Sequence, residues 1–297
     1  MKYVITGGAG NISGPLVKNL LAAGMQVTVI GRSAENLKEL VQAGATAAIG
    51  SVEDGDFLTK AFKSADAVYT MIPPKFETDN WKKYVASVAE NYATAIKGSN
   101  IKHVVNLSSV GAHLSEGAGP ISALYYAERA LNGLEGVNVL HLRPTFFYQN
   151  LFASIPLVKN AGIIGSNFAI NDNKFPLADP TDIAHVAFQE LLNLKFKGSG
   201  FRYIASDEVS TDAIARTIGN AIGKPDLKWV IFSDGDALQA MRRTGVSEEI
   251  AKNLTQMHAA LNVGSVTEDY WQNKPLVLGR VKLADFAKVF SLVYAAS

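Results

Sequence analysis

The sequence of 297 residues contains no cysteine, which excludes disulfides, thiolate metal sites and thiol catalysis. It also lacks any apolar run close to the ~20 residues that span a membrane, so we expect no membrane partner. No Lys or Arg cluster exceeds two adjacent residues and the net charge is +1, which argues against a nucleic-acid partner. The first apolar run begins at Tyr3, leaving no room for a signal peptide, and we expect a cytoplasmic protein.

Histidine is sparse, and the five histidines lie too far apart along the chain to form a pair with metal-ligand spacing. We therefore predict no metal site and favour structural roles for the histidines, with His113 as the one catalytic candidate among them. The remaining composition, 48% hydrophobic and 19% charged, is that of a folded soluble protein with one large domain or two moderate ones.

A glycine-rich turn follows the first apolar run and leads directly into an amphipathic stretch that begins near Asn11 or Ile12. Pro15 suits the first turn of a helix, where its missing N–H costs nothing. Glycines before a helix N-terminus let backbone N–H groups approach a diphosphate. A plain strand–turn–helix connection is the alternative. The cofactor contacts predicted from this turn are Thr6, Gly7, Gly10, Asn11 and Ile12.

The next predicted strand, residues 26–30, ends at Gly31-Arg32-Ser33, where a dinucleotide-binding unit places its second strand. NAD-selective sites carry an acidic residue at this point, whereas an arginine pairs with the 2′-phosphate of NADP. A solvated arginine at a helix start is the alternative. The position of Arg32 and Ser33 predicts NADP(H) as the cofactor.

Strands and helices alternate through the first half of the chain. This alternation predicts an α/β fold, a doubly wound parallel sheet of the Rossmann type. The predicted strands cover 46–49, 67–72, 103–107 and 137–142, and the predicted helices cover 35–42, 57–62, 80–97 and 121–134. Ligands bind at the carboxyl ends of such strands. The further cofactor contacts expected there are Ser51, Val52, Ile72, Pro73, Pro74, Ser108, Thr145 and Phe146.

Beyond about residue 150 the pattern becomes irregular and mainly helical. We expect residues 1–150 to form the NADP-binding domain, with 179–204 returning to it. Residues 151–178 and 205–297 are expected to form a smaller, mostly helical lobe for a substrate or partner. The aromatic residues of this region suit either a lid over an acceptor or an interdomain core; they are Phe146, Phe147, Tyr148, Phe152, Phe168 and Trp271.

These segments together resemble the NmrA-like family of atypical short-chain dehydrogenase/reductases, which includes quinone oxidoreductases and triphenylmethane reductases. The segments that match lie at residues 6–12, 31–32, 65–68, 73–74, 105–109, 128–131, 142–151 and 176–184. Two positions depart from the family pattern. Ser51 stands where an acidic residue often contacts the adenine, and Ser13 replaces the third glycine of the loop.

The resemblance raises the question of a proton donor, because short-chain dehydrogenases use a Tyr-x-x-x-Lys pair. In relatives, the helix that carries this pair continues as Lys-x-x-x-Glu-x-x-Leu. Glu128-x-x-Leu131 matches the end of that pattern, so the positions of the pair are counted back from Glu128. The lysine and tyrosine positions are then Leu124 and Pro120, neither of which carries an acid. Tyr125 lies one residue out of register, about 100° around the helix. We predict that the pair is absent, and Tyr125 and Tyr126 join His113 as the remaining catalytic candidates.

Such a protein is expected to be an NADPH-dependent reductase of quinone-like or other conjugated small acceptors, which take hydride and collect a proton from water. The alternative is a non-catalytic NADP(H) redox sensor that acts through a regulatory protein partner. A homo-oligomer also stays open. A nucleotide-sugar epimerase or dehydratase is disfavoured, because those reactions need a base at the missing tyrosine position.

Overall fold

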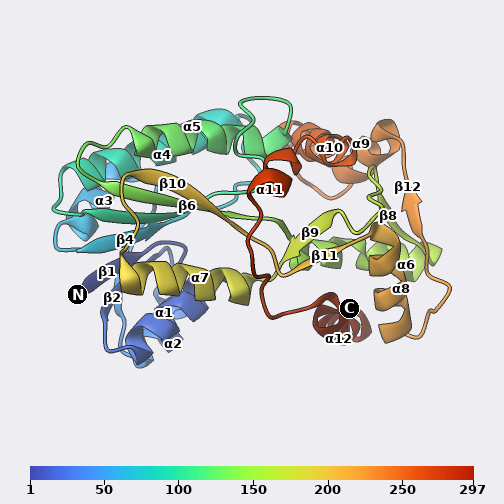
Figure 1. Cartoon of the computed structure of the whole chain (residues 1–297), viewed down its shortest axis with the longest axis horizontal. Coiled ribbons are helices and arrows are strands. Elements are labelled where there is room, and N and C mark those ends of the chain that lie inside the picture. The colour runs from blue at the N-terminus through green and yellow to red at the C-terminus, as the bar shows by residue number, and fades with distance from the viewer.

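The computed structural model describes residues 1–297, and its centre is a seven-stranded sheet in the order β10-β6-β5-β4-β1-β2-β3 (Figure 1). Every neighbouring pair in this sheet is parallel, which confirms the predicted doubly wound fold. Its strands are β1 (Lys2–Ile5), β2 (Gln26–Gly31), β3 (Thr46–Ile49), β4 (Ala67–Thr70), β5 (His103–Leu107), β6 (Asn138–Pro144) and β10 (Ser199–Ile204).

The central strands form because their side chains are apolar on both faces, and all four residues of β4 are buried. Helices cover the two faces of the sheet (Figure 1). On one face lie α1 (Ser13–Ala22), α2 (Ala34–Gln42) and α7 (Pro180–Asn193), and on the other α3 (Gly55–Phe62), α4 (Trp81–Lys97) and α5 (Ser122–Asn132).

The strand predicted over 67–72 is shorter than expected and ends at Thr70. The next N–H group, that of Met71, donates to the Thr6 side chain (2.9 Å) instead of to a strand neighbour. This bond ties the end of β4 to the glycine-rich turn after β1. The carboxyl ends of the two central strands are thereby held side by side.

The rest of the chain forms a smaller part with an aromatic-rich core (Figure 1). No helix of the structure is both long enough and apolar enough to cross a membrane. The strands of the smaller part make two small sheets: β7 (Phe146–Phe147), β9 (Phe175–Ala178) and β11 (Asp207–Val209) in one, β8 (Ile164–Ser166) and β12 (Trp229–Ile231) in the other. Its helices are α6 (Ile155–Ala161), α8 (Thr211–Ala221), α9 (Asp234–Arg242), α10 (Glu248–Asn262), α11 (Glu268–Asn273) and α12 (Leu283–Ala296).

A buried ion-pair network connects the large sheet with this smaller part. Arg143 on β6 donates to Glu128 of α5 (2.7 Å) and to Asp269 of α11 (3.2 Å), and its guanidinium lies 4.1 Å from the ring centre of Phe201. Because Arg143 and Glu128 are almost fully buried, loss of Arg143 would leave the Glu128 carboxylate without a positive partner in the interior.

Candidate functional site

The turn between β1 and α1 has the backbone shape that the glycines predict. Gly7 and Gly8 have φ of +94° and +56°, a region that favours glycine. A Cβ atom at Gly7 would lie 2.5 Å from Ser13 Oγ. That Oγ donates to the Thr6 carbonyl (2.8 Å), which explains why a serine fits at the third glycine position.

The N-terminus of α1 is left without a side-chain cap, whereas α2, α3 and α4 are capped by Ser33, Asp54 and Asn80. The N–H groups of Asn11 and Ile12 have no partner within the chain. Unpaired donors at a helix N-terminus favour a bound anion, because the helix dipole adds partial positive charge there. These donors therefore suit a diphosphate.

A cavity of about 670 Å³ opens in front of this turn and extends along the ends of β2, β3 and β4. Such a volume suits one half of a dinucleotide. The predicted cofactor contacts that it brings together are Gly7, Gly10, Arg32, Ser33, Ser51, Val52, Pro73 and Pro74.

Arg32 lines this cavity as an exposed side chain that makes no hydrogen bond or ion pair within the chain. Ser33 beside it accepts the N–H of Asn36 (3.4 Å) at the start of α2. The two residues directly after β2 are Arg32 and Ser33, so no carboxylate stands at this point to repel a phosphate. The guanidinium is thus free to bind an anion placed in the cavity.

The opposite wall carries charged and aromatic residues that the sequence analysis did not select. Lys75 Nζ lies 2.8 Å from Glu53 Oε2 and 5.1 Å from the ring centre of Tyr84. The Tyr84 hydroxyl donates to the Pro73 carbonyl (2.9 Å). Burial, together with the charge of Glu53, raises the pKa of Tyr84 to about 12, although the charge of Arg32 lowers it. Lys75 and Glu53 follow predicted strand ends closely in the sequence, and this signal could have identified them.

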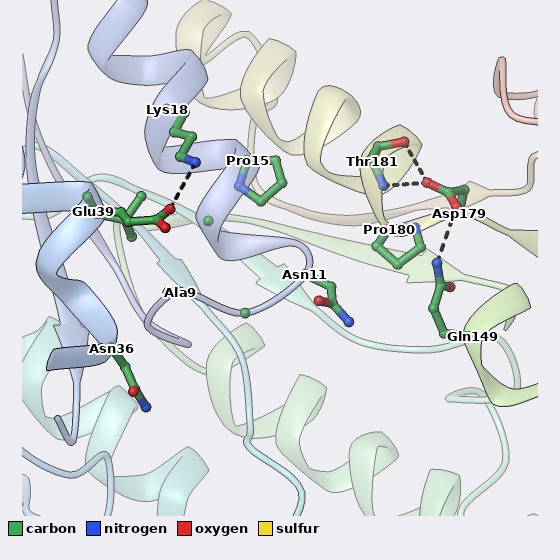
Figure 2. A pocket seen from close by; sticks show the side chains of 13 residues that line it. Ala9, Asn11, Pro15, Lys18, Asn36, Glu39, Gln149, Asp179, Pro180 and Thr181 are labelled. Atoms are coloured by element: carbon green, nitrogen blue, oxygen red, sulfur yellow. Dashed lines mark hydrogen bonds and ion pairs between the residues drawn. The ribbon is translucent and has the colours of Figure 1, made fainter. Parts of the chain in front are cut away.

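A second, more polar cavity of about 370 Å³ lies on the other side of Gly10 and Asn11, between the N-termini of α1 and α7 (Figure 2). Asp179 caps α7 by accepting the Thr181 N–H (2.8 Å) and also accepts from the Gln149 amide (3.3 Å). Gln149 Oε1 has no partner and is buried. The two cavities share Gly10, so the polar surface continues past the glycine-rich turn.

The other predicted contacts lie behind or beside these cavities and line neither of them. Thr6 is fully buried in its bond to Met71, and Ile12 is also buried. Ile72 packs between the sheet and α4. The remaining three stand at the ends of β5 and β6. The Ser108 hydroxyl donates to Glu128 (2.5 Å), the Thr145 hydroxyl is buried without a partner, and Phe146 packs against Phe168 and Phe175.

The catalytic candidates are not brought to the cavities. The Tyr125 hydroxyl accepts a hydrogen bond from Arg129 (3.2 Å) on the outer side of α5, and Tyr126 is half exposed to solvent. His113 is half-buried, and its Nδ1 has no partner. Neither cavity is lined by any of these three side chains.

A model of the NAD(P)H-binding family matches residues 7–149 of the chain, the segment that holds the glycine-rich turn and all the residues that line the large cavity. The chain contains an NAD(P)H-binding domain. This finding confirms the class of cofactor that was predicted from the turn and the strand that follows it.

The comparisons extend beyond this domain. An uncharacterized protein of Schizosaccharomyces pombe, C2A9.02, is 28% identical over 250 residues, which cover 76% of this chain and 82% of the relative. The Escherichia coli NADPH-dependent quinone oxidoreductase QOR2, solved with NADPH, shares the fold with a TM-score of 0.81 at 18% identity, covering 97% of this chain and 99% of that one. The Citrobacter sp. triphenylmethane reductase, solved with NADP(H), has a TM-score of 0.81 at 18% identity over 98% and 100% of the two chains. These matches support the predicted resemblance to the NmrA-like atypical short-chain dehydrogenase/reductases.

Proposed function

We propose that the cavity of about 670 Å³ binds the adenosine half of NADP(H) and that Arg32 selects NADP(H) over NAD(H). The observation that carries this proposal is an arginine without any partner at the end of β2, in the wall of the cavity. A guanidinium forms two parallel hydrogen bonds with a phosphate, whereas the 2′-hydroxyl of NAD offers no charge to it.

The diphosphate would lie on the uncapped N-terminus of α1, where the N–H groups of Asn11 and Ile12 point to no other acceptor. The nicotinamide would then reach the ends of β4, β5 and β6, which are neighbours in the sheet. Pro73, Ser108 and Thr145 stand at those ends, and ligands of doubly wound sheets bind there.

We propose that the protein with its cofactor bound is an NADPH-dependent reductase of small conjugated acceptors such as quinones. The bound nicotinamide would supply hydride, and the protein would contribute orientation and an apolar environment. The lack of an acid at the predicted dyad positions supports such an acceptor. Pro120 and Leu124 occupy these positions, and the Tyr125 hydroxyl is bonded to Arg129. A conjugated acceptor collects its proton from water.

Calorimetry with NADPH and NADH on the unmutated protein tests the cofactor, and oxidation of NADPH across a panel of quinones and simple ketones tests the reaction. We expect tighter binding of NADPH and reduction of electron-poor quinones only. Equal affinity for both nucleotides would refute the role of Arg32. Tight NADPH binding without reduction of any acceptor would instead favour the redox sensor that acts through a protein partner.

A further inference from the structure

Two neighbouring loops in one wall of the large cavity carry opposite charges. Glu53 belongs to the turn between β3 and α3, and Lys75 belongs to the segment between β4 and α4. Their side chains meet at 2.8 Å although the residues lie 22 positions apart in the sequence. Both residues line the same cavity as Arg32.

The backbones of both loops are held in place. The Asn91 amide on α4 donates to the carbonyls of Val52 and Glu53 (3.2 and 3.0 Å). On the other side, the Pro73 carbonyl accepts from the Tyr84 hydroxyl. The positions of Glu53 and Lys75 along the cavity wall are therefore fixed by contacts that do not involve their charged groups.

The charged ends of the two side chains, in contrast, are free to move. The Lys75 and Glu53 side chains are 39% and 45% exposed. An ion pair this exposed contributes on the order of 0–1 kcal/mol, because water screens it and both side chains lose rotamer entropy. A stronger anion nearby can thus take Lys75 from Glu53 at little cost.

The charge balance of the cavity indicates which anion that would be. Its charged lining residues are Arg32, Lys75, Glu53 and Glu77, so the two positive charges are cancelled by two negative ones. A 2′-phosphate brings close to two further negative charges, which Arg32 alone does not balance. The other cation in the lining is Lys75. Tyr84 lies near both cations, because Lys75 stands over the Tyr84 ring and the charge of Arg32 lowers the pKa of the Tyr84 hydroxyl.

We propose, on the basis of the proposed NADP(H) site, that Lys75 is a second specificity-determining cation for the 2′-phosphate and that Glu53 competes with the phosphate for it. In the cofactor-free protein, Glu53 holds Lys75 at the cavity wall. When NADPH binds, the ammonium group turns from the carboxylate to the phosphate. Glu53 therefore lowers the affinity for NADPH, and Lys75 raises the preference for NADPH over NADH.

Calorimetric titration of Lys75→Gln and Glu53→Gln with NADPH and with NADH tests the proposal. We expect Lys75→Gln to weaken NADPH binding about fivefold or more, because a charge-assisted contact is lost, and to change NADH binding less than about twofold. Glu53→Gln should strengthen NADPH binding about threefold, since Lys75 no longer has to leave a carboxylate. In the double variant this gain should disappear.

Lys274→Gln is the matched control. Lys274 also pairs with a carboxylate, Glu208 (2.9 Å), and lies 5.3 Å from the ring centre of Trp271, but it lines neither cavity. It should leave both affinities unchanged.

Four outcomes would overturn the proposal. An equal loss of NADPH and NADH affinity in Lys75→Gln would mean that Lys75 only closes the adenosine pocket. Weaker NADPH binding in Glu53→Gln would mean that the ion pair supports the site instead of competing with it. Tight NADPH binding that Lys75→Gln leaves unchanged would overturn this proposal alone, whereas no NADPH binding by the unmutated protein would overturn the proposed function as well.

Discussion

At the residue scale, two arginines differ in whether their charge is paired within the chain. Arg143 is buried and fully paired, with Glu128 and Asp269 around it, so it stabilises the junction between the sheet and the smaller part. Arg32 is exposed in a cavity wall and has no partner. A residue whose hydrogen-bonding capacity is unused within a cavity is the one available to a ligand.

Arg32→Ala should therefore weaken NADPH binding by about 1.5–3 kcal/mol, the loss of one charge-assisted contact, and leave NADH binding nearly unchanged. Calorimetry with both nucleotides measures this. Arg243→Ala serves as a control, because Arg243 is also exposed and unpaired but lies in neither cavity. Parallel losses for NADPH and NADH in Arg32→Ala would contradict the prediction.

A second residue-scale prediction concerns Tyr125, whose hydroxyl is bonded to Arg129 on the outer side of α5. Tyr125→Phe should keep NADPH-dependent quinone reduction within about threefold of the unmutated protein, less than ~1 kcal/mol in barrier. Removal of a working general acid typically costs about 10²–10⁴-fold. Steady-state kinetics decide between these values, and a loss of about a hundredfold would show that this tyrosine delivers the proton.

At the scale of elements, the first turn of α7 holds the C-terminal part of the chain against the sheet. Asp182 accepts the N–H groups of Arg280 (3.0 Å) and Val281 (3.1 Å) and the hydroxyl of Ser206 (2.7 Å). The approach is close enough that a Cβ at Gly279 would lie 2.2 Å from the Asp182 carboxylate. The segment between α11 and α12 is thus attached to α7 mainly through one buried carboxylate.

Asp182→Ala should lower the free energy of unfolding by about 3 kcal/mol or more, because three donors lose a charged acceptor in a buried position. Urea unfolding followed by circular dichroism measures it. Asp226→Ala, at an exposed aspartate without hydrogen bonds, should change the midpoint little. A similar small effect at Asp182 would mean that water replaces the carboxylate at this contact.

At the scale of the whole molecule, stability depends on pH through His141, which is buried, and His258, which is partly buried. His141, on β6 of the large sheet, is hydrogen-bonded to Asn106 and Asn132, and His258 is hydrogen-bonded to Ser166 in the smaller part. Burial lowers the pKa of each to about 4, from 6.5 in an unfolded chain. The unfolded chain therefore binds more protons between these two pH values.

The free energy of unfolding should fall as the pH drops below about 6.5 toward 4, by up to about 1.4 kcal/mol per pH unit for each of the two histidines. Above pH 6.5 both are neutral in either state, and their contribution is constant. Urea unfolding at several pH values between 7.5 and 5 measures the slope. His141→Gln and His258→Gln should each reduce it, and an unchanged slope in both variants would contradict the assignment of the buried neutral imidazoles.

The sequence by itself determined the order of strands and helices, the parallel sheet and the NAD(P)H-binding turn. These features are local: a buried strand needs a short apolar run, and the positive φ of Gly7 and Gly8 needs glycine. The position of Arg32 directly after β2 also follows from the local pattern, because the carboxyl ends of parallel strands face the ligand.

Only the tertiary structure decided which side chains meet at those strand ends. The sequence places Ser108 directly after a strand, but it does not contain the bond of the Ser108 hydroxyl to Glu128, 20 residues further along the chain. Two strands lie between β4 and β3 in the sheet, but both strands end at the same edge. The loops that follow them therefore bring Lys75 to Glu53. The direction of a side chain depends on the packing of neighbours from distant segments, which periodicity and spacing do not contain.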